Sequence, residues 1–316
     1  MLRPLWLLLA VLVLTTPPPA AAGDDRAMRL VTFNLLHGGP WSGVTGRDDH
    51  LEARLSLMVE QLRALDADVV ALQESPVTRW RGDVSARLAA ALGLSRVHAR
   101  ATERVFPWRW VGRLIVGALG FVEGPAILSR YPIVASEVYE LPRCRDRIDP
   151  RLALRADVAT PAGVLPVFST HTARDDCQTR RLVELASARR SALPAVLMGD
   201  LNTVETAPAL QEIVAHGFVD AFRTANPTAA GATVRQDVTA STSTARRRID
   251  YVFVLPGTAF TADVVSSRVV LDRPRHNGDG STLWPSDHYG VFAEVILRSR
   301  SKPRARQRAI SSRQAR

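Results

Sequence analysis

Short apolar runs recur along the chain, and their length and composition are those of buried β-strands. They cover residues 29–33, 68–72, 126–128, 164–169, 195–198, 251–255 and 289–297. Between the first two runs, Leu51, Leu55, Met58 and Leu62 follow the spacing of an amphipathic helix, with arginine and glutamate on the opposite face. The same spacing predicts further helices over residues 84–92, 178–193 and 208–216.

The order of these elements predicts an α/β protein with mixed sheets. Strands and helices alternate early in the chain, whereas strand pairs are expected over residues 127–138 and 152–168. Residues 223–246 are rich in Thr, Ala and Ser, and predict a long loop. No change of composition divides the body, so we expect a single catalytic domain over residues 23–297.

Residues 1–22 have the layout of a secretory signal peptide: Arg3, an apolar run over residues 5–14, a proline cluster, and three alanines before Gly23. An uncleaved anchor is the alternative, but the run is too short to span a bilayer. We therefore expect a protein that is secreted or held in the periplasm or cell envelope. In such a compartment the only cysteines, Cys144 and Cys177, are able to form a disulfide.

The net charge of +10 belongs mainly to the end of the chain. Residues 298–316 hold eight basic residues and no acidic one, a pattern typical of a disordered tail. Without these eight and Arg3, 32 basic residues stand against 31 acidic residues in the body. The tail is either a solvated extension or a tether to DNA, anionic lipid or an acidic polymer. Nothing in the body's charge indicates a partner, and we expect a monomer.

Polar residues stand where the predicted strands begin or end, which is where ligands gather in α/β sheets. Asparagine and acidic side chains suit a site for Mg²⁺, Mn²⁺ or Ca²⁺, and histidines exchange protons or bind phosphate oxygens. Together these groups indicate metal-assisted hydrolysis of a phosphate ester. The residues concerned are Asn34, Glu74, His171, Asp200, Asn202, Asp250, Asp287 and His288.

Seven segments carry a resemblance to a known family: VTFNLLHG, ALQES, GPAILSRYPI, FSTHT, LMGDLNT, RRRIDYVFV and WPSDHYGVF. In this order they resemble the endonuclease/exonuclease/phosphatase superfamily, which includes deoxyribonucleases, abasic-site endonucleases, sphingomyelinases and inositol-polyphosphate 5-phosphatases. The resemblance extends over nearly the whole body. It implies a four-layered α/β sandwich, with two mixed β-sheets face to face and helices outside, and a divalent-metal phosphoesterase.

The resemblance also implies a role for each site residue. Glu74 would be the principal metal ligand, and Asn34 and Asp287 would complete or support the metal site. Asp200 would orient or deprotonate the attacking water, and Asn202 would hold Asp200 or the phosphate.

The remaining implied roles belong to two histidines. His288 would transfer a proton or bind phosphate, with its tautomer fixed by Asp250, and His171 would contact the scissile phosphate or assist the leaving group. The branches of the family differ over whether the aspartate or the histidine is the general base, and both assignments stay open.

The substrate is not determined by the resemblance. A secreted nuclease, a sphingomyelinase-type or phosphoinositide-type lipid enzyme, and a non-catalytic binding module are the alternatives to a general phosphodiesterase. Residues 105–121 place Trp108 and Trp110 beside arginines on an apolar stretch. This stretch is either a helix or hairpin packed on the body, a membrane-surface anchor, or a platform for stacking nucleobases. The run Arg246-Arg247-Arg248 either faces the cleft or forms a solvated turn.

Overall fold

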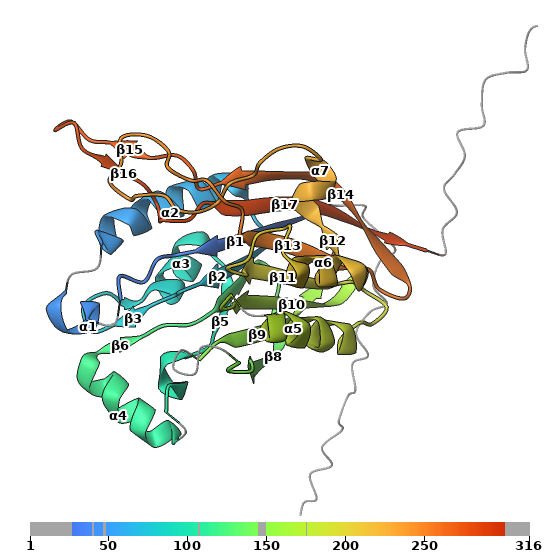
Figure 1. Cartoon of the computed structure of the whole chain (residues 1–316), viewed down its shortest axis with the longest axis horizontal. Coiled ribbons are helices and arrows are strands. Elements are labelled where there is room, and N and C mark those ends of the chain that lie inside the picture. The colour runs from blue at the N-terminus through green and yellow to red at the C-terminus, as the bar shows by residue number, and fades with distance from the viewer. Residues whose placement is uncertain are drawn as a thin grey trace, which may run out of the picture.

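Two six-stranded sheets pack face to face and form the body of the protein (Figure 1). The computed structural model describes residues 27–39, 41–46, 49–106, 108–144, 150–174 and 176–300. The predicted signal peptide and most of the predicted basic tail lie outside these residues, so the division into leader, domain and tail stays a prediction.

The strands of both sheets are mixed in direction, as predicted. In the first sheet the order is β14 (Phe260–Val270), β17 (Gly290–Ser299), β1 (Met28–Asn34), β2 (Val69–Gln73), β7 (Ala126–Ser129) and β5 (Ser95–His98). In the second it is β12 (Val219–Asp220), β13 (Asp250–Leu255), β11 (Ala195–Asp200), β10 (Gly163–His171), β9 (Leu152–Thr160) and β8 (Ile133–Glu140). In each sheet the central pair, β1 with β2 and β10 with β11, is parallel, and its other neighbours are antiparallel.

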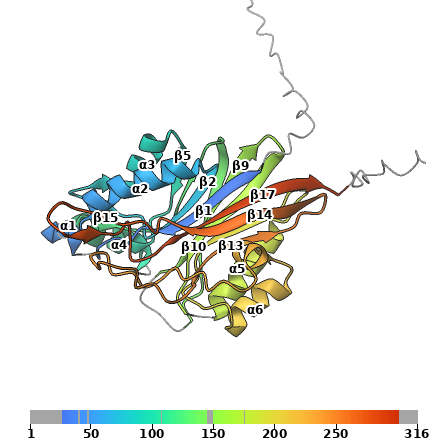
Figure 2. The same ribbon diagram turned by 90° about the horizontal axis from the view of Figure 1, so that it is seen from above.

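Helices cover the outer face of each sheet, which completes four layers (Figures 1 and 2). The helices α2 (Leu51–Leu65) and α3 (Val84–Leu92) pack on the first sheet, and α5 (Asp176–Ala188) and α6 (Pro208–Ala215) pack on the second. The remaining short elements are α1 (Ser42–Thr45), β3 (Val77–Thr78), β4 (Gly82–Asp83), η1 (Thr102–Arg104), α4 (Arg109–Leu119), β6 (Phe121–Val122), α7 (Ala221–Ala225), β15 (Arg275–His276) and β16 (Thr282–Leu283). The predicted four-layered α/β sandwich is therefore confirmed.

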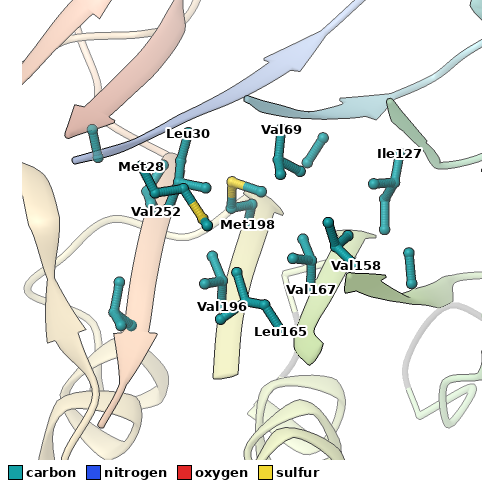
Figure 3. Packing of buried hydrophobic residues seen from close by; sticks show 14 of the residues in the cluster. Met28, Leu30, Val69, Ile127, Val158, Leu165, Val167, Val196, Met198 and Val252 are labelled. Carbon is teal, nitrogen blue, oxygen red and sulfur yellow. The ribbon is translucent and has the colours of Figure 1, made fainter. Parts of the chain in front are cut away.

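Alternation along the strands explains why the central strands read as unbroken apolar runs. In β1, Leu30 points into the core between the sheets, whereas Val31 points outward against α2. Figure 3 shows the inner layer, in which Leu30 and Val69 of the first sheet face Val196 and Val252 of the second. Because both faces of these strands are buried, polar residues are displaced to the strand ends.

Two expectations from the sequence are wrong, one for a strand pair and one for the end of a helix. Residues 127–138 do not form a strand pair, since β7 pairs with β2 and β5, whereas β8 pairs with β9 in the other sheet. The turn between them is bonded to both sheets: the Arg130 amide donates to the Asp68 carbonyl, and the Pro132 carbonyl accepts from Ala159. The chain therefore crosses from one sheet to the other at this turn.

The helix expected over residues 178–193 ends at Ala188. Leu193 extended the apolar pattern, but it packs in the core between the sheets, and Pro194 after it disfavours a helical conformation. The sequence also failed to predict β14, a long edge strand whose residues are mostly only partly buried, so that it has no continuous apolar run. Beyond the end of α7, the loop expected over residues 223–246 holds no helix or strand, but buries Thr233 and Gln236.

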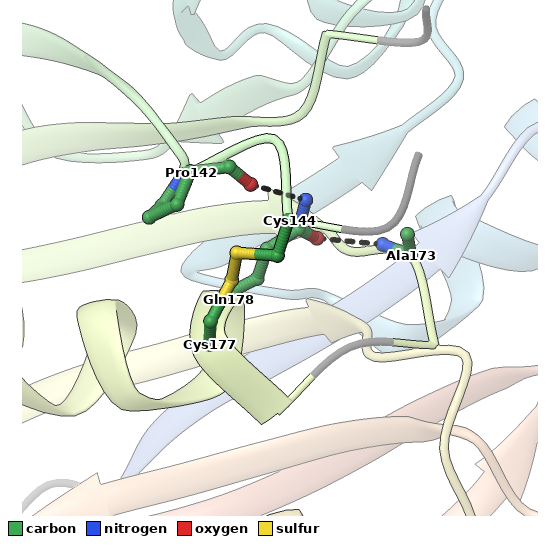
Figure 4. Close-up of a disulfide and its surroundings, with 5 residues drawn as sticks. All are labelled: Pro142, Cys144, Ala173, Cys177 and Gln178. Carbon is green, nitrogen blue, oxygen red and sulfur yellow. Dashed lines mark hydrogen bonds between the residues drawn. A yellow bond between two sulfur atoms is a disulfide. The ribbon is translucent and has the colours of Figure 1, made fainter. Parts of the chain in front are cut away.

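The cysteine pair is joined in a disulfide between the segment after β8 and the first turn of α5 (Figure 4). Gln178 reinforces this link, because its Nε2 donates to the Pro142 carbonyl and its Oε1 accepts from the Ala173 amide. The bridged cysteines are 33 residues apart, and α5 begins shortly after His171 at the end of β10. The disulfide thus anchors the start of α5, shortly after that strand end, to the segment that follows β8.

We predict that replacing Cys144 and Cys177 by serine lowers the free energy of unfolding by about 3–4 kcal/mol, the loop-closure entropy for a loop of this length. Denaturant unfolding of the variant and of the wild type, with and without reductant, measures this change. Reductant should bring the wild type to the value of the variant and leave the variant unchanged. Equal stability of all samples would contradict the prediction.

Candidate active site

The predicted site residues converge at one end of the sandwich, where strands of both sheets stop. The parallel register of β1 with β2 places Asn34 beside Gln73, and that of β10 with β11 places His171 beside Asp200. The residues that come together are Asn34 and Glu74 from the first sheet, Asp287 and His288 before β17, and His171, Asp200, Asn202 and Asp250 from the second sheet.

Asn34 joins the two sheets across the site. Its Nδ2 donates at 3.1 Å to Glu74 Oε1 and at 3.1 Å to Asp200 Oδ2, and it is fully buried. Its Oδ1 accepts from the Leu36 amide at 3.1 Å. In this orientation Asn34 presents N–H donors to both carboxylates. This fits the second of the two roles expected for Asn34, which is to support the metal site.

Glu74 follows β2 directly, and its backbone is in the left-handed region, with φ of 51°. A non-glycine residue pays conformational strain there, and such strain is common at functional sites. Burial opposes ionisation of Glu74, but His37, His171 and the Asn34 amide outweigh it and lower the pKa to about 2. Glu74 is therefore a carboxylate at neutral pH, as a metal ligand must be.

His37 contacts Glu74 and was not singled out from the sequence. Its Nδ1 accepts from the Gly39 amide at 2.7 Å, so the ring proton sits on Nε2, which lies 3.3 Å from Glu74 Oε2. The His37 amide also donates to Glu74 Oε2 at 3.3 Å, and its ring meets Phe121 edge-on at 5.4 Å. The signal that would have found it is its place three residues after Asn34, inside a segment already tied to the site.

Asp200 and Asn202 form a tight turn at the end of β11. The Asn202 amide donates to Asp200 Oδ1 at 2.8 Å, and Asn202 itself is left-handed, with φ of 50°. Asn202 Nδ2 donates at 2.9 Å to His171 Nε2 and at 2.9 Å to the Thr172 carbonyl. Gly199 allows β11 to approach β10 this closely, because a Cβ there would stand 2.1 Å from the Thr170 carbonyl oxygen.

His288 is held between two aspartates. Its Nδ1 lies 3.0 Å from Asp250 Oδ2, and its Nε2 lies 3.7 Å from Asp200 Oδ2. Burial alone would lower the pKa of His288, but Asp250 and Asp200 outweigh it and raise the pKa to about 10. Burial, reinforced by the charge of Asp250, raises the pKa of Asp200. His288 is thus a cation at neutral pH, beside a carboxyl able to take up a proton.

The pKa of His171 is shifted in the opposite direction to that of His288. Because Asn202 donates to its Nε2, the proton of the neutral ring lies on Nδ1, 3.9 Å from Glu74 Oε1. Burial, followed by the positive charge of Arg151, holds the pKa of His171 well below its ordinary value. His171 is therefore neutral near pH 7, and Arg151 is a second group near the site that the sequence did not indicate.

Arg54 ties the first sheet to the segment that carries Asp287. Its guanidinium is fully buried and donates to the carbonyls of Leu35, Leu36 and Pro285 at 2.7–3.0 Å. It comes from α2, where the sequence showed only a polar residue on a helix. Ser286 adds a second tie, because its hydroxyl donates to the Asn34 carbonyl at 2.7 Å and accepts from the His288 amide.

The donor set fits a hard divalent cation, which prefers carboxylate oxygens. Glu74 is ionised and keeps 17% of its side chain exposed, and the charge of Glu74 contributes, after burial, to raising the pKa of Asp287. Asp200, Asp250 and His288 also offer ligand atoms within 4.8 Å of one another. Within the described part of the chain, Oδ1 of Asp250 is buried and accepts no hydrogen bond. Glu74 and Asp287 are the residues that would hold the ion, with Asn34 supporting Glu74.

The run Arg246-Arg247-Arg248 does not act as one unit. Arg248 is buried, pairs with Glu205 and Asp220, and lies over the Tyr251 ring at 4.6 Å. It is a structural cation of the second sheet, whereas Arg246 and Arg247 are exposed.

Comparisons with known proteins agree with this fold. The profile of the Endonuclease/Exonuclease/phosphatase family matches residues 31–288. An endonuclease/exonuclease/phosphatase from Beutenbergia cavernae is 26% identical, with a TM-score of 0.61, covering 86% of this chain and 72% of that one. A mannosyl-6-phosphatase from Bacteroides thetaiotaomicron is 18% identical, with a TM-score of 0.64 and coverage of 85% and 99%. The human Nocturnin catalytic domain is 19% identical, with a TM-score of 0.61 and coverage of 87% and 94%. No curated protein sequence matches the chain.

We predict that His37→Ala raises the Mg²⁺ concentration required for half-maximal activity by about 10–100-fold, because Glu74 loses a partner that orients it. His37→Gln, which keeps an N–H donor, should recover part of this loss. Titration of activity with Mg²⁺ measures the effect, and His216→Ala, an exposed histidine at the end of α6, is the control. An unchanged Mg²⁺ titration for His37→Ala would show that His37 does not orient the ligand.

Proposed function

The chain belongs to the endonuclease/exonuclease/phosphatase family of divalent-metal-dependent phosphoester hydrolases, and from this premise we propose that it is an exported phosphodiesterase. The observation that carries the proposal is the buried cluster in which Asn34 joins Glu74 to Asp200 and His288 lies between Asp200 and Asp250. This cluster offers an anionic ligand, a proton acceptor and a cation close to one another, which is what attack of water on a phosphate ester requires.

Asp200, His288 and His171 differ in their pKa values, and we assign each a role that its protonation state allows. Asp200, with its raised pKa, takes the proton from the attacking water, and Asn202 holds that carboxyl in place. His288, kept charged by Asp250, binds a phosphate oxygen, and neutral His171 hydrogen-bonds the phosphate or the leaving oxygen from Nδ1. Mg²⁺, or Mn²⁺ or Ca²⁺ in its place, would supply positive charge to the phosphate oxygens when bound at Glu74 and Asp287.

Nucleic acid and lipid are the two substrate classes that we weigh for an exported enzyme of this kind. The near-neutral body weighs against a nuclease, whose groove carries surplus arginine and lysine along the phosphate track. A non-catalytic binding module is disfavoured because no position of the expected catalytic set is replaced. The predicted leader supports export, and the basic tail offers a tether to an anionic polymer or membrane.

We predict that Asp200→Ala and His288→Ala each lower kcat by about 10²–10⁴-fold, the usual contribution of a positioned proton acceptor or phosphate-binding group. Steady-state kinetics on a soluble diester measures the loss, and thermal unfolding checks that the variants fold. Asp263→Ala, which removes a carboxylate of β14 paired only with Arg298 in the described residues, is the matched control. Near-normal kcat in folded Asp200→Ala or His288→Ala would refute the assigned roles.

We predict that activity on a substrate panel requires a divalent cation. The panel holds bis-p-nitrophenyl phosphate, plasmid DNA, sphingomyelin and phosphoinositides, each assayed with Mg²⁺ and with EDTA. Hydrolysis should fall to background in EDTA and return when Mg²⁺ is added in excess. Equal rates in EDTA and Mg²⁺ would contradict the metal-dependent reaction, and the relative rates in Mg²⁺ identify the substrate class.

A further inference from the structure

Exposed aromatic and aliphatic side chains gather on three adjoining segments, α1, the β3–β4 turn and α4. Four tryptophans are 58–69% exposed there, whereas the fifth that the structure describes, Trp284, is 4% exposed. Water-exposed tryptophan at this density is unusual for a soluble surface and marks an interaction site. We call this surface the tryptophan face; it consists of Trp41, Val44, Trp80, Phe106, Trp108, Trp110, Leu114 and Ile115.

The three segments lie next to one another and are joined by direct contacts. Trp80 Nε1 donates to the Gly43 carbonyl at 3.0 Å, which ties the β3–β4 turn to α1. A Cβ on Gly43 would stand 2.3 Å from the Leu119 carbonyl oxygen, so α1 lies directly against the end of α4. Both views place α1 and α4 at the same end of the molecule (Figures 1 and 2).

Helix α4 presents an apolar stripe to solvent although its other side is already packed. Gly112 and Val116 are buried, and a Cβ on Gly112 would stand 2.1 Å from the Glu103 carbonyl oxygen. Trp110 and Leu114 lie four residues apart and therefore on one outward stripe. An ordinary surface helix places polar residues there, so this stripe has no role in the fold of the chain itself.

Arginine is the only charged residue type on these segments. Arg79, Arg81, Arg109 and Arg113 belong to residues 41–46, 79–82 and 105–120, which hold no acidic residue. Arg113 pairs with Glu103 at 3.6 Å and keeps 64% of its side chain exposed. Tryptophan beside arginine is the composition that binds the headgroup region of an anionic bilayer.

The tryptophan face is connected to the candidate active site through Phe121 and His37. Phe121 follows α4 directly, and its ring meets the ring of His37, which lies beside Glu74. Trp41 stands four residues beyond His37 in the chain. The tryptophan face and the predicted metal ligand are therefore joined by short segments of the chain and by the contact between Phe121 and His37.

We propose that the tryptophan face binds the surface of an anionic phospholipid bilayer, and that the substrate is a phosphodiester of a lipid in that bilayer; the second statement rests on the proposed phosphodiesterase activity. Binding is peripheral: α4 has eleven residues, and within the described residues no helix has the length and apolar character that crossing a membrane needs. Stacking on nucleobases would explain the tryptophans, but Val44, Leu114 and Ile115 gain nothing from it, whereas all of them gain from an acyl boundary.

Co-sedimentation with phosphatidylglycerol/phosphatidylcholine vesicles tests the binding step. We expect the variant Trp108→Ser/Trp110→Ser to partition into the pellet about tenfold less than the wild type, since each lost tryptophan removes apolar area from the interface. Leu114→Glu should act in the same direction. The control is Val134→Ser/Val265→Ser, which removes exposed apolar side chains from β8 and β14. All these proteins carry the same basic tail, so a difference reports the tryptophan face alone.

Two further measurements separate the outcomes. Hydrolysis of soluble bis-p-nitrophenyl phosphate should be unchanged in both tryptophan-face variants, and hydrolysis of vesicle lipid should fall in parallel with binding. Equal pelleting of all proteins would overturn the proposal, and so would loss of oligonucleotide binding with vesicle binding intact. A third outcome is loss of vesicle binding in the variants with no hydrolysis of any diester by the wild type. It would support membrane binding by the tryptophan face and refute the proposed phosphodiesterase activity.

Discussion

Carboxylates from both sheets are buried at the same strand ends, and the amide of Asn34 holds one from each, Glu74 and Asp200, in hydrogen-bonding distance. Burial of unpaired like charges between two sheets would be strongly unfavourable, so the site depends on its donors. The charge of His288 meets the same need beside Asp200. The relative position of the sheets is thereby fixed by the site as well as by the apolar core beneath it. Gln73 and Ser169 add a smaller polar bridge of the same kind at 3.3 Å.

The sheets and most site residues could be predicted because the fold separates apolar from polar positions along each central strand. A strand buried on both faces has no place for a carboxylate or histidine except at its end, where Asp200 and His171 stand. The edges of the sheets do not obey this rule. The partly buried β14 has no apolar run, and β7 and β8 were assigned to one pair because nothing local marks a crossing between sheets.

The residues that sequence reasoning missed act through contacts between distant segments. Arg54 lies on α2 and reaches the carbonyls of Leu36 and Pro285, the latter 231 positions away. In a helical pattern such an arginine is indistinguishable from a solvated one, such as Arg63. His37 was missed for another reason: it lies in an irregular segment, where neither periodicity nor strand ends assign a direction to the side chain. Arg248 shows the same error as Arg54, since an arginine in a basic run is buried in the structure.

The candidate catalytic groups lie at strand ends and the tryptophan face lies on connecting segments, and this separation determines where the protein tolerates substitution. The groups expected to do chemistry project from the ends of packed strands, and Gly199 illustrates how little room that scaffold leaves for substitution. The tryptophan face sits on α1, the β3–β4 turn and α4, whose side chains do not contribute to the core between the sheets. Substitutions on these short connections therefore leave the packing between the sheets in place, whereas a substitution such as one at Gly199 disturbs the strands that carry the candidate active site.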